Sequence, residues 1–121
     1  MKVLVVEDDA LLRRIIIRTL RRMDSDVEIR AAESVDEAIE HLREAVLDRP
    51  FDLITCDFNL IGVRTGAEVL EWVREHASFL VPRFLFISAN DEVKKHHDNY
   101  LAKPADLAQL REAIEATLQR S

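Results

Sequence analysis

Cysteine is almost absent from this sequence, because Cys56 is the only one among the 121 residues. No disulfide can therefore form within the chain, which favours a reducing compartment. No apolar run approaches the roughly 18 residues that cross a bilayer. The N-terminal sequence MKVLVVEDD also lacks the organisation of a signal peptide. We therefore expect a cytoplasmic protein with no membrane partner.

Positive charge is the scarcer sign, because 17 lysines and arginines stand against 23 acidic residues and the net charge is -6. This balance argues against the nucleic-acid backbone as the main partner, although it does not exclude a small local basic patch. The length suffices for one domain and is too short for two. Residues 1–121 are therefore expected to form a single domain.

Glycine is scarce as well, and Gly62 and Gly66 both follow the apolar segment 51–56. The sequence has neither the G-x-G-x-x-G pattern of dinucleotide-binding proteins nor the phosphate-binding loop G-x-x-x-x-G-K-[ST]. Unusual backbone geometry is instead expected in the loop 58–65. Cys56 lies within the apolar segment, so we interpret it as a small buried side chain rather than a reactive thiol.

Continuous apolar runs predict strands that are buried on both faces, as in a parallel sheet. They cover residues 3–6, 53–56 with Phe51 before them, and 84–87, and residues 100–102 predict a short last strand. Residues 27–32 alternate between apolar and polar, which predicts an edge strand.

Helical patterns, with apolar residues three and four positions apart, follow the strands. A strand followed by a helix occurs five times, which predicts an α/β fold with a doubly wound, five-stranded parallel sheet and helices on both faces. Only residues 89–98 separate the last two strands. Because a parallel crossover needs roughly 10 to 12 residues at minimum, the fourth helix is expected to have at most about two turns.

Polar residues follow the predicted strands and should meet at one edge of the sheet, where open α/β sheets place their ligands. Glu7 and Asp8 follow the first strand, Asp57 the third, Ser88 the fourth and Lys103 the fifth. Two like charges about 4 Å apart cost around 4 kcal/mol at an effective dielectric of 20, so three carboxylates require positive charge nearby.

The ammonium group of Lys103 supplies part of that positive charge, and a divalent cation can supply more. Mg²⁺ suits a site with a few carboxylates, open water positions and a phosphate. A phosphoryl group could bind the metal, Ser88 and Lys103, while Asp57 acts as the nucleophile that forms an acyl phosphate.

The motifs VLVVEDD (3–9), DFN (57–59), FISA (86–89) and YLAKP (100–104) occur in an order and at positions that resemble a known family. It is the receiver domain of two-component response regulators, especially the single-domain chemotaxis type. The resemblance covers the whole chain. It implies the flavodoxin-like strand order 2-1-3-4-5, a single receiver domain without an output domain, and a cis peptide bond between Lys103 and Pro104.

The resemblance also implies a phosphorylation site that uses Mg²⁺. Asp57 resembles the phosphate acceptor of the family. Asp8, Asp57 and the backbone carbonyl of Asn59 would hold Mg²⁺, with Glu7 helping through a water molecule. Glu7 stands where the family more often has aspartate, and its longer side chain still reaches metal-bound water.

Further roles are implied for residues around the acceptor. Ser88 and Lys103 would contact the phosphoryl group, and Ser88 and Tyr100 resemble the family's conformational switch. Asn59 and Asn90 occupy positions that tune the lifetime of the phosphate. The segment 89–98 is shorter than its counterpart in the family, where this part of the chain belongs to the surface that changes on phosphorylation.

Three hypotheses about function follow. The first is a phosphorylatable receiver, not a classical enzyme, that takes a phosphoryl group from a sensor histidine kinase or a histidine phosphotransfer protein and signals to a downstream protein. The second is a receiver-like binding module that acts independently of phosphorylation. The third is an aspartyl-phosphate phosphatase of the haloacid dehalogenase type, which places a second aspartate two positions after the nucleophile. Asn59 occupies that position here and cannot serve as such an acid.

Overall fold

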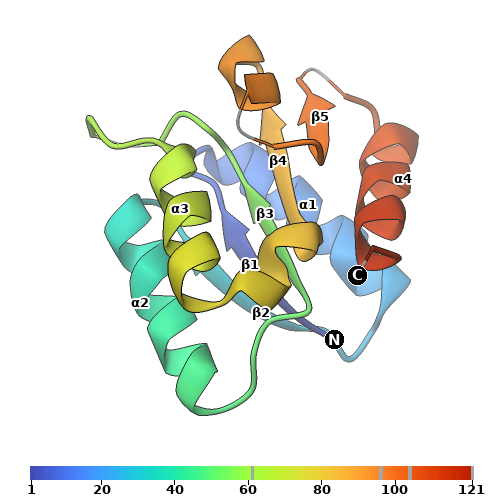
Figure 1. The fold of residues 1–121 in the computed structure, drawn as a ribbon. Coiled ribbons are helices and arrows are strands. Elements are labelled where there is room, and N and C mark those ends of the chain that lie inside the picture. The colour runs from blue at the N-terminus through green and yellow to red at the C-terminus, as the bar shows by residue number, and fades with distance from the viewer. Residues whose placement is uncertain (61, 96, 104, 121) are drawn as a thin grey trace.

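The computed structural model of the protein describes residues 1–60, 62–95, 97–103 and 105–120, with only the backbone of Asp91. Five strands form one parallel sheet in the order β2-β1-β3-β4-β5 (Figure 1). They are β1 (Lys2–Val6), β2 (Glu28–Ala32), β3 (Leu53–Cys56), β4 (Phe84–Ser88) and β5 (Tyr100–Ala102). The predicted fold class and strand order are confirmed, whereas the predicted cis Lys103–Pro104 bond lies outside the described residues.

The three central strands are buried along their whole length, as their continuous apolar runs predict. Alternate side chains of these strands enter two separate cores. Leu4, Ile54 and Phe86 belong to one core, whereas Val5 and Leu85 belong to the other. β2 lies at the edge of the sheet, as predicted, and exposes Arg30 there.

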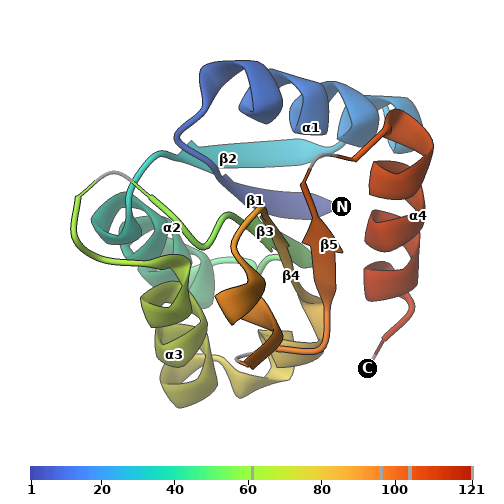
Figure 2. The ribbon, with the colours of Figure 1, turned by 90° about the horizontal axis from the view of Figure 1, so that it is seen from above.

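Two layers of helices cover the sheet, one on each face (Figure 2). α1 (Ala10–Met23) and α4 (Leu107–Leu118) pack on one face, and α2 (Val35–Leu47) and α3 (Gly66–His76) pack on the other. Asp9 caps α1 by accepting hydrogen bonds from the Leu11 and Leu12 amides, which starts this helix directly after Glu7 and Asp8. None of the described helices is long and apolar enough to cross a membrane.

The connection between β4 and β5 is short, as predicted, and its helical part is the 3₁₀ helix η2 (Asp91–Lys95). Val93 anchors η2 by burying its side chain completely in the core. His97 Nε2 lies 2.6 Å from the Phe84 carbonyl oxygen, and because that oxygen can only accept, Nε2 carries the hydrogen. A second 3₁₀ helix, η1 (Ser78–Arg83), precedes β4 and was not predicted from the sequence.

The loop after β3 returns to the sheet so closely that it tolerates only glycine at one position. A Cβ atom added to Gly66 would lie 2.2 Å from the Asp57 carbonyl oxygen and 3.0 Å from Cys56 Sγ. Gly62 has a different requirement, because its φ is +96° and nothing lies within 4 Å of an added Cβ. The expectation of unusual geometry in this loop is confirmed at Gly62, and Gly66 adds a close approach to the backbone of Asp57.

We expect Gly66→Ala to destabilise the fold and to displace the backbone at Asp57. Overpacking a tight site costs about 1–3 kcal/mol, measurable by urea unfolding, and the displacement should change the amide resonances of Cys56 and Asp57. Gly62→Ala is the matched control: its cost of about 1–2 kcal/mol comes from a positive φ and should leave those resonances in place. A Gly66→Ala variant as stable as the parent would contradict this account of the loop.

Candidate phosphoacceptor site

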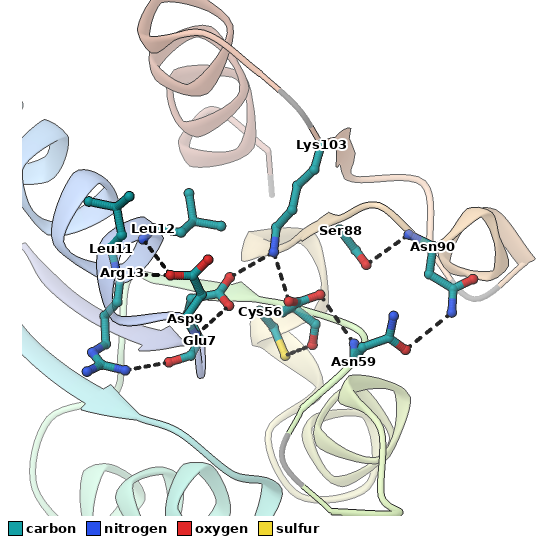
Figure 3. Close-up of polar contacts among 11 residues, drawn as sticks. Glu7, Asp9, Leu11, Leu12, Arg13, Cys56, Asn59, Ser88, Asn90 and Lys103 are labelled. Carbon is teal, nitrogen blue, oxygen red and sulfur yellow. Dashed lines mark hydrogen bonds and ion pairs between the residues drawn. The ribbon is translucent and has the colours of Figure 1, made fainter.

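The carboxyl ends of four strands bring the predicted site residues to one edge of the sheet. Glu7 follows β1, Asp57 follows β3, Ser88 ends β4 and Lys103 follows β5. Parallel backbone pairing fixes this convergence, because the Asp57 amide donates to Val6 O and the Lys103 amide donates to Ser88 O at 3.0 Å each. Figure 3 shows Glu7, Ser88 and Lys103 around one small volume.

Lys103 bridges two of the carboxylates. Its Nζ donates to Glu7 Oε1 at 3.2 Å and to Asp57 Oδ2 at 2.9 Å (Figure 3). The Glu7 side chain is 1% exposed and that of Asp57 is 8% exposed, so water screens these interactions weakly. One ammonium therefore neutralises part of a buried group of negative charges.

Burial is the main reason why the pKa of Glu7 is raised from 4.5 to about 7. The hydrogen bond from the Asp9 amide opposes this shift, the charge of Asp57 adds to it, and Lys103 lowers the pKa again. Glu7 therefore still carries its proton in much of the population near neutral pH. The site holds more carboxylates than one lysine can compensate.

The pKa of Lys103 is raised, so this side chain stays charged. Burial would lower its pKa, but the hydrogen bond to Asp57 and the charges of Glu7 and Asp57 outweigh that effect. Lys103 is thus a permanent cation that contacts the carboxylate of Asp57. A positive group in this position can pair with the oxygens of a phosphoryl group.

Glu7, Asp8 and Asp57 form a candidate metal site, because each offers a carboxylate oxygen and these atoms all lie within 4.8 Å of one another. Asp8 is half-buried at the rim, whereas the other two are buried. Hard oxygen donors, an open rim for water and an excess of negative charge fit Mg²⁺ or a similar divalent cation. The donor set therefore agrees with the predicted cofactor.

A chain of hydrogen bonds links the acceptor to the remaining polar residues. The Asn59 amide donates to Asp57 Oδ1 at 3.2 Å, and Asn90 Nδ2 donates to Asn59 Oδ1 at 3.3 Å. The Asn90 amide in turn donates to Ser88 Oγ at 3.2 Å, and Ser88 is completely buried. Asn59 and Asn90 therefore contact each other and connect Asp57 to Ser88 (Figure 3).

Tyr100 lies on β5, opposite Phe86 in the strand register, and packs against the core on the side of α2 and α3. It is half-buried, and Lys94 Nζ lies 5.8 Å from the centroid of its ring. Among the described residues, no hydrogen bond of the structure joins this ring to the acceptor. Its role as a switch stays a prediction.

Cys56 is buried, as expected, and its thiol donates to the Asp57 carbonyl oxygen at 3.2 Å. Burial, followed by the charges of Asp57 and Glu7, raises the pKa of this thiol well above its ordinary value. The thiol therefore stays protonated and helps to hold the backbone of Asp57, which supports the interpretation of a structural cysteine.

The arginine face of α1 was missed when only the net charge was considered. This helix has five arginines and no acidic residue: Arg13, Arg14, Arg18, Arg21 and Arg22. Arg13 donates to Glu7 O at 2.9 Å and pairs with Glu33 at 3.1 Å. The other four are exposed and have no ion pair within the described part of the chain. The sequence RRIIIRTLRR could have shown this local basic patch.

Sequence comparison places the chain with signalling proteins. The family described as response regulator receiver domain matches residues 3–115. The response regulator protein PilR of Pseudomonas aeruginosa is 28% identical over 98% of this chain and 26% of its own length. The sensory transduction protein LytR of Staphylococcus epidermidis is 29% identical over 94% of this chain and 44% of its own length. The chain thus spans between a quarter and a half of these relatives.

Solved structures agree with the sequence comparison. The phosphorylated cyanobacterial phytochrome response regulator RcpA has a TM-score of 0.74 and 27% identity over 94% of this chain and 88% of its own. A putative response regulator of Chloroflexus aurantiacus has a TM-score of 0.78 and 25% identity over 98% of both chains. The Mn²⁺-bound response regulator Rcp1 shares the fold at 21% identity, with a TM-score of 0.72 over 94% of this chain and 88% of its own. The family match covers nearly the whole chain, and the parallel sheet and the acidic site agree with it. The chain therefore belongs to the response regulator receiver domain family.

Proposed function

We propose that the protein accepts a phosphoryl group on Asp57, with Mg²⁺ bound beside it, and passes the signal on through contacts with another protein. The observation that carries this proposal is the meeting of three carboxylates and Lys103 in one small site. The phosphoryl donor would be a sensor histidine kinase or a histidine phosphotransfer protein. Three further points stay predictions: residues 1–121 act without an output domain, the protein is cytoplasmic, and it does not bind nucleic acid directly.

The transfer would exchange one phosphorus bond for another. A carboxylate oxygen of Asp57 attacks the phosphorus atom, the phosphorus–nitrogen bond of phosphohistidine breaks, and its electron pair returns to the imidazole, which is protonated. Lys103 already contacts Asp57 Oδ2, so it would pair with a phosphoryl oxygen without a large movement.

Asp8, Asp57, Glu7 and the carbonyl of Asn59 would hold the cation. Mg²⁺, when bound, neutralises charge on the transferring phosphoryl group. The description of Rcp1 with bound Mn²⁺ gives a precedent for a divalent cation in this fold. Glu7 is buried more deeply than Asp8, and this burial leaves it partly protonated near neutral pH. A cation that binds there would displace this proton.

The surrounding residues would govern the result of phosphorylation. Ser88 would approach the phosphoryl group, and Tyr100 would follow it inward as the second part of the switch. Asn59 and Asn90, which connect Asp57 to Ser88, would control the access of water, and thus the lifetime of the phosphate. A phosphatase of the haloacid dehalogenase type is disfavoured, because the amide of Asn59 cannot act as its proton donor.

A receiver-like module that acts without phosphate is the alternative, and the short η2 segment favours it. Little of the chain is available to rearrange between β4 and β5. Partner binding that persists in Asp57→Ala and does not depend on Mg²⁺ would support this alternative over the first proposal.

The arginine face of α1 favours an acidic phosphodonor, because α1 begins directly beside Glu7 and Asp8. Arginine pairs well with carboxylates in a fixed fork geometry. Phosphotransfer from a purified protein donor should therefore slow more steeply with rising salt concentration than transfer from acetyl phosphate, which is too small to contact α1 broadly. Equal salt dependence for both donors would remove the support for an acidic docking surface.

We expect acetyl phosphate with Mg²⁺ to add one phosphoryl group to the protein, detected by intact-mass spectrometry. Beryllofluoride with Mg²⁺ should shift the amide resonances of Asp57, Ser88 and Lys103. Asp57→Asn is the matched control, because it keeps the shape of the side chain and removes the nucleophile. Equal labelling of Asp57→Asn, or no labelling of the parent, would contradict the assignment of the acceptor.

Without divalent cations, we expect the contribution of Glu7 to the free energy of unfolding to fall between about pH 5 and about pH 8. Unfolded Glu7 ionises near 4.5, whereas the folded protein holds this proton up to a pKa of about 7. The folded state therefore binds more protons in this window. The resulting stability is fully present below 4.5 and is lost as pH rises through 7, by at most about 3 kcal/mol.

Urea unfolding at several pH values measures this loss, with Glu7→Gln as the control. The glutamine variant should lose the part of the pH dependence that Glu7 causes. Mg²⁺ should stabilise the parent most at the high-pH end, because the cation replaces the missing proton. An unchanged slope in Glu7→Gln would show that the buried glutamate is not its origin.

A further inference from the structure

A second concave site lies at the opposite end of β5 from Lys103, a groove of about 460 Å³ partly lined by η2. Its walls come from α3, η1, η2, the residues before β5 and the end of the chain after α4. The lining residues are Arg74, Val81, Pro82, Lys94, Lys95, His97, Asp98, Asn99 and Arg120. No residue of the phosphoacceptor site takes part.

Hydrogen bonds around Asn99 build the floor of the groove. Asn99 is 7% exposed, and its Nδ2 donates to the Pro82 carbonyl oxygen at 2.8 Å. Its side-chain oxygen accepts from the Arg120 guanidinium, and its carbonyl oxygen accepts from the Phe86 amide at 3.1 Å. The groove is therefore formed before any ligand arrives, which reduces the entropy cost of binding.

The charge of the groove is opposite to that of the whole chain. Four cationic side chains line it (Arg74, Lys94, Lys95 and Arg120), against Asp98 as the one acid among its described lining residues, and both arginines also interact with other groups of the chain. Lys95 also pairs with Glu92 at 3.3 Å, but both side chains are exposed, so this pair is weak and exchangeable. An excess of positive charge in a chain of net charge -6 marks a site for an anion.

Arg74 and Arg120 line the same groove as His97. Burial lowers the pKa of His97 and the hydrogen bond to Phe84 opposes this, while the charge of Arg74 lowers the pKa, that of Asp98 raises it and that of Arg120 lowers it. Arg74 belongs to α3 and Arg120 follows α4, so guanidinium groups from distant parts of the chain act on the same ring. The planar guanidinium group can donate two parallel hydrogen bonds to the oxygens of a phosphate group.

We propose that this groove binds a diphosphate or triphosphate group, either free or carried by a nucleoside. Several cations spread over separate walls match an anion of several charges better than a single phosphate. The volume lies within the usual range for small-molecule sites, and Val81 and Pro82 provide an apolar wall beside the charges. This inference is independent of the phosphorylation of Asp57.

The test is a titration of the ¹⁵N-labelled protein with pyrophosphate and, separately, with ATP, both in EDTA. Without Mg²⁺ the carboxylates of the Asp57 site repel polyanions, so binding there is suppressed. We expect shifts at Lys94, His97 and Asn99, with a dissociation constant below about 1 mM. Tighter binding of ATP would identify a nucleotide as the source of the phosphates, and equal binding would identify the free polyphosphate group.

Arg74→Ala and Lys94→Ala are the test variants, and both remove exposed side chains. Each should weaken binding at least about tenfold, the effect of losing one charge-assisted hydrogen bond. Arg111→Ala is the matched control, because Arg111 is an exposed arginine of α4 outside the groove. Arg14→Ala with Arg18→Ala tests the competing arginine face of α1.

Three results would overturn the proposal. They are no shift at millimolar pyrophosphate or ATP, loss of binding in the α1 double variant instead of the groove variants, and equal binding of sulfate at matched ionic strength. The first shows that the groove is not a site, the second moves the site to α1, and the third reduces it to a general anion attraction. None of them bears on the labelling of Asp57 by acetyl phosphate.

Discussion

The contact of Lys103 with two buried carboxylates is the interaction on which the site depends. Glu7 and Asp57 come from neighbouring strands, and the parallel sheet brings their side chains together at its carboxyl edge. A single ammonium does not balance them and Asp8, and burial together with the charge of Asp57 raises the pKa of Glu7. The fold thus holds a site whose charges are satisfied only when a proton or a cation joins them.

The backbone around Asp57 is held from several directions, so this crowded arrangement persists. The Asp57 amide donates to β1, its carbonyl oxygen accepts from the Cys56 thiol, and Gly66 allows α3 to begin directly against that carbonyl. None of these contacts uses the side chain of Asp57. The carboxylate is therefore free to exchange a lysine contact for a metal or a phosphoryl group while the backbone stays fixed.

Strand positions and strand ends could be predicted from the sequence, because a buried parallel strand has a continuous apolar run and a polar residue where it leaves the core. Glu7, Asp57, Ser88 and Lys103 were located in this way. The edge contact of His97 with Phe84 and the floor around Asn99 could not be predicted, since they depend on how a short connection crosses the end of the sheet. The arginines of α1 were visible in the sequence, but a net charge averages over the surface and hides where charges gather.

Only the three residues of β5 separate the basic groove from the carboxylate site. Asn99, at the floor of the basic groove, precedes this three-residue strand, and Lys103, at the acceptor, follows it. β5 is the edge strand and pairs with β4, so a displacement of one end would pass to the other if the strand moved as a unit. Energetic coupling between two ligands is reciprocal. An anion that holds Asn99 and Arg120 in place would therefore affect how easily Lys103 moves from Asp57 to a phosphoryl group, and a phosphoryl group would affect the groove to the same extent.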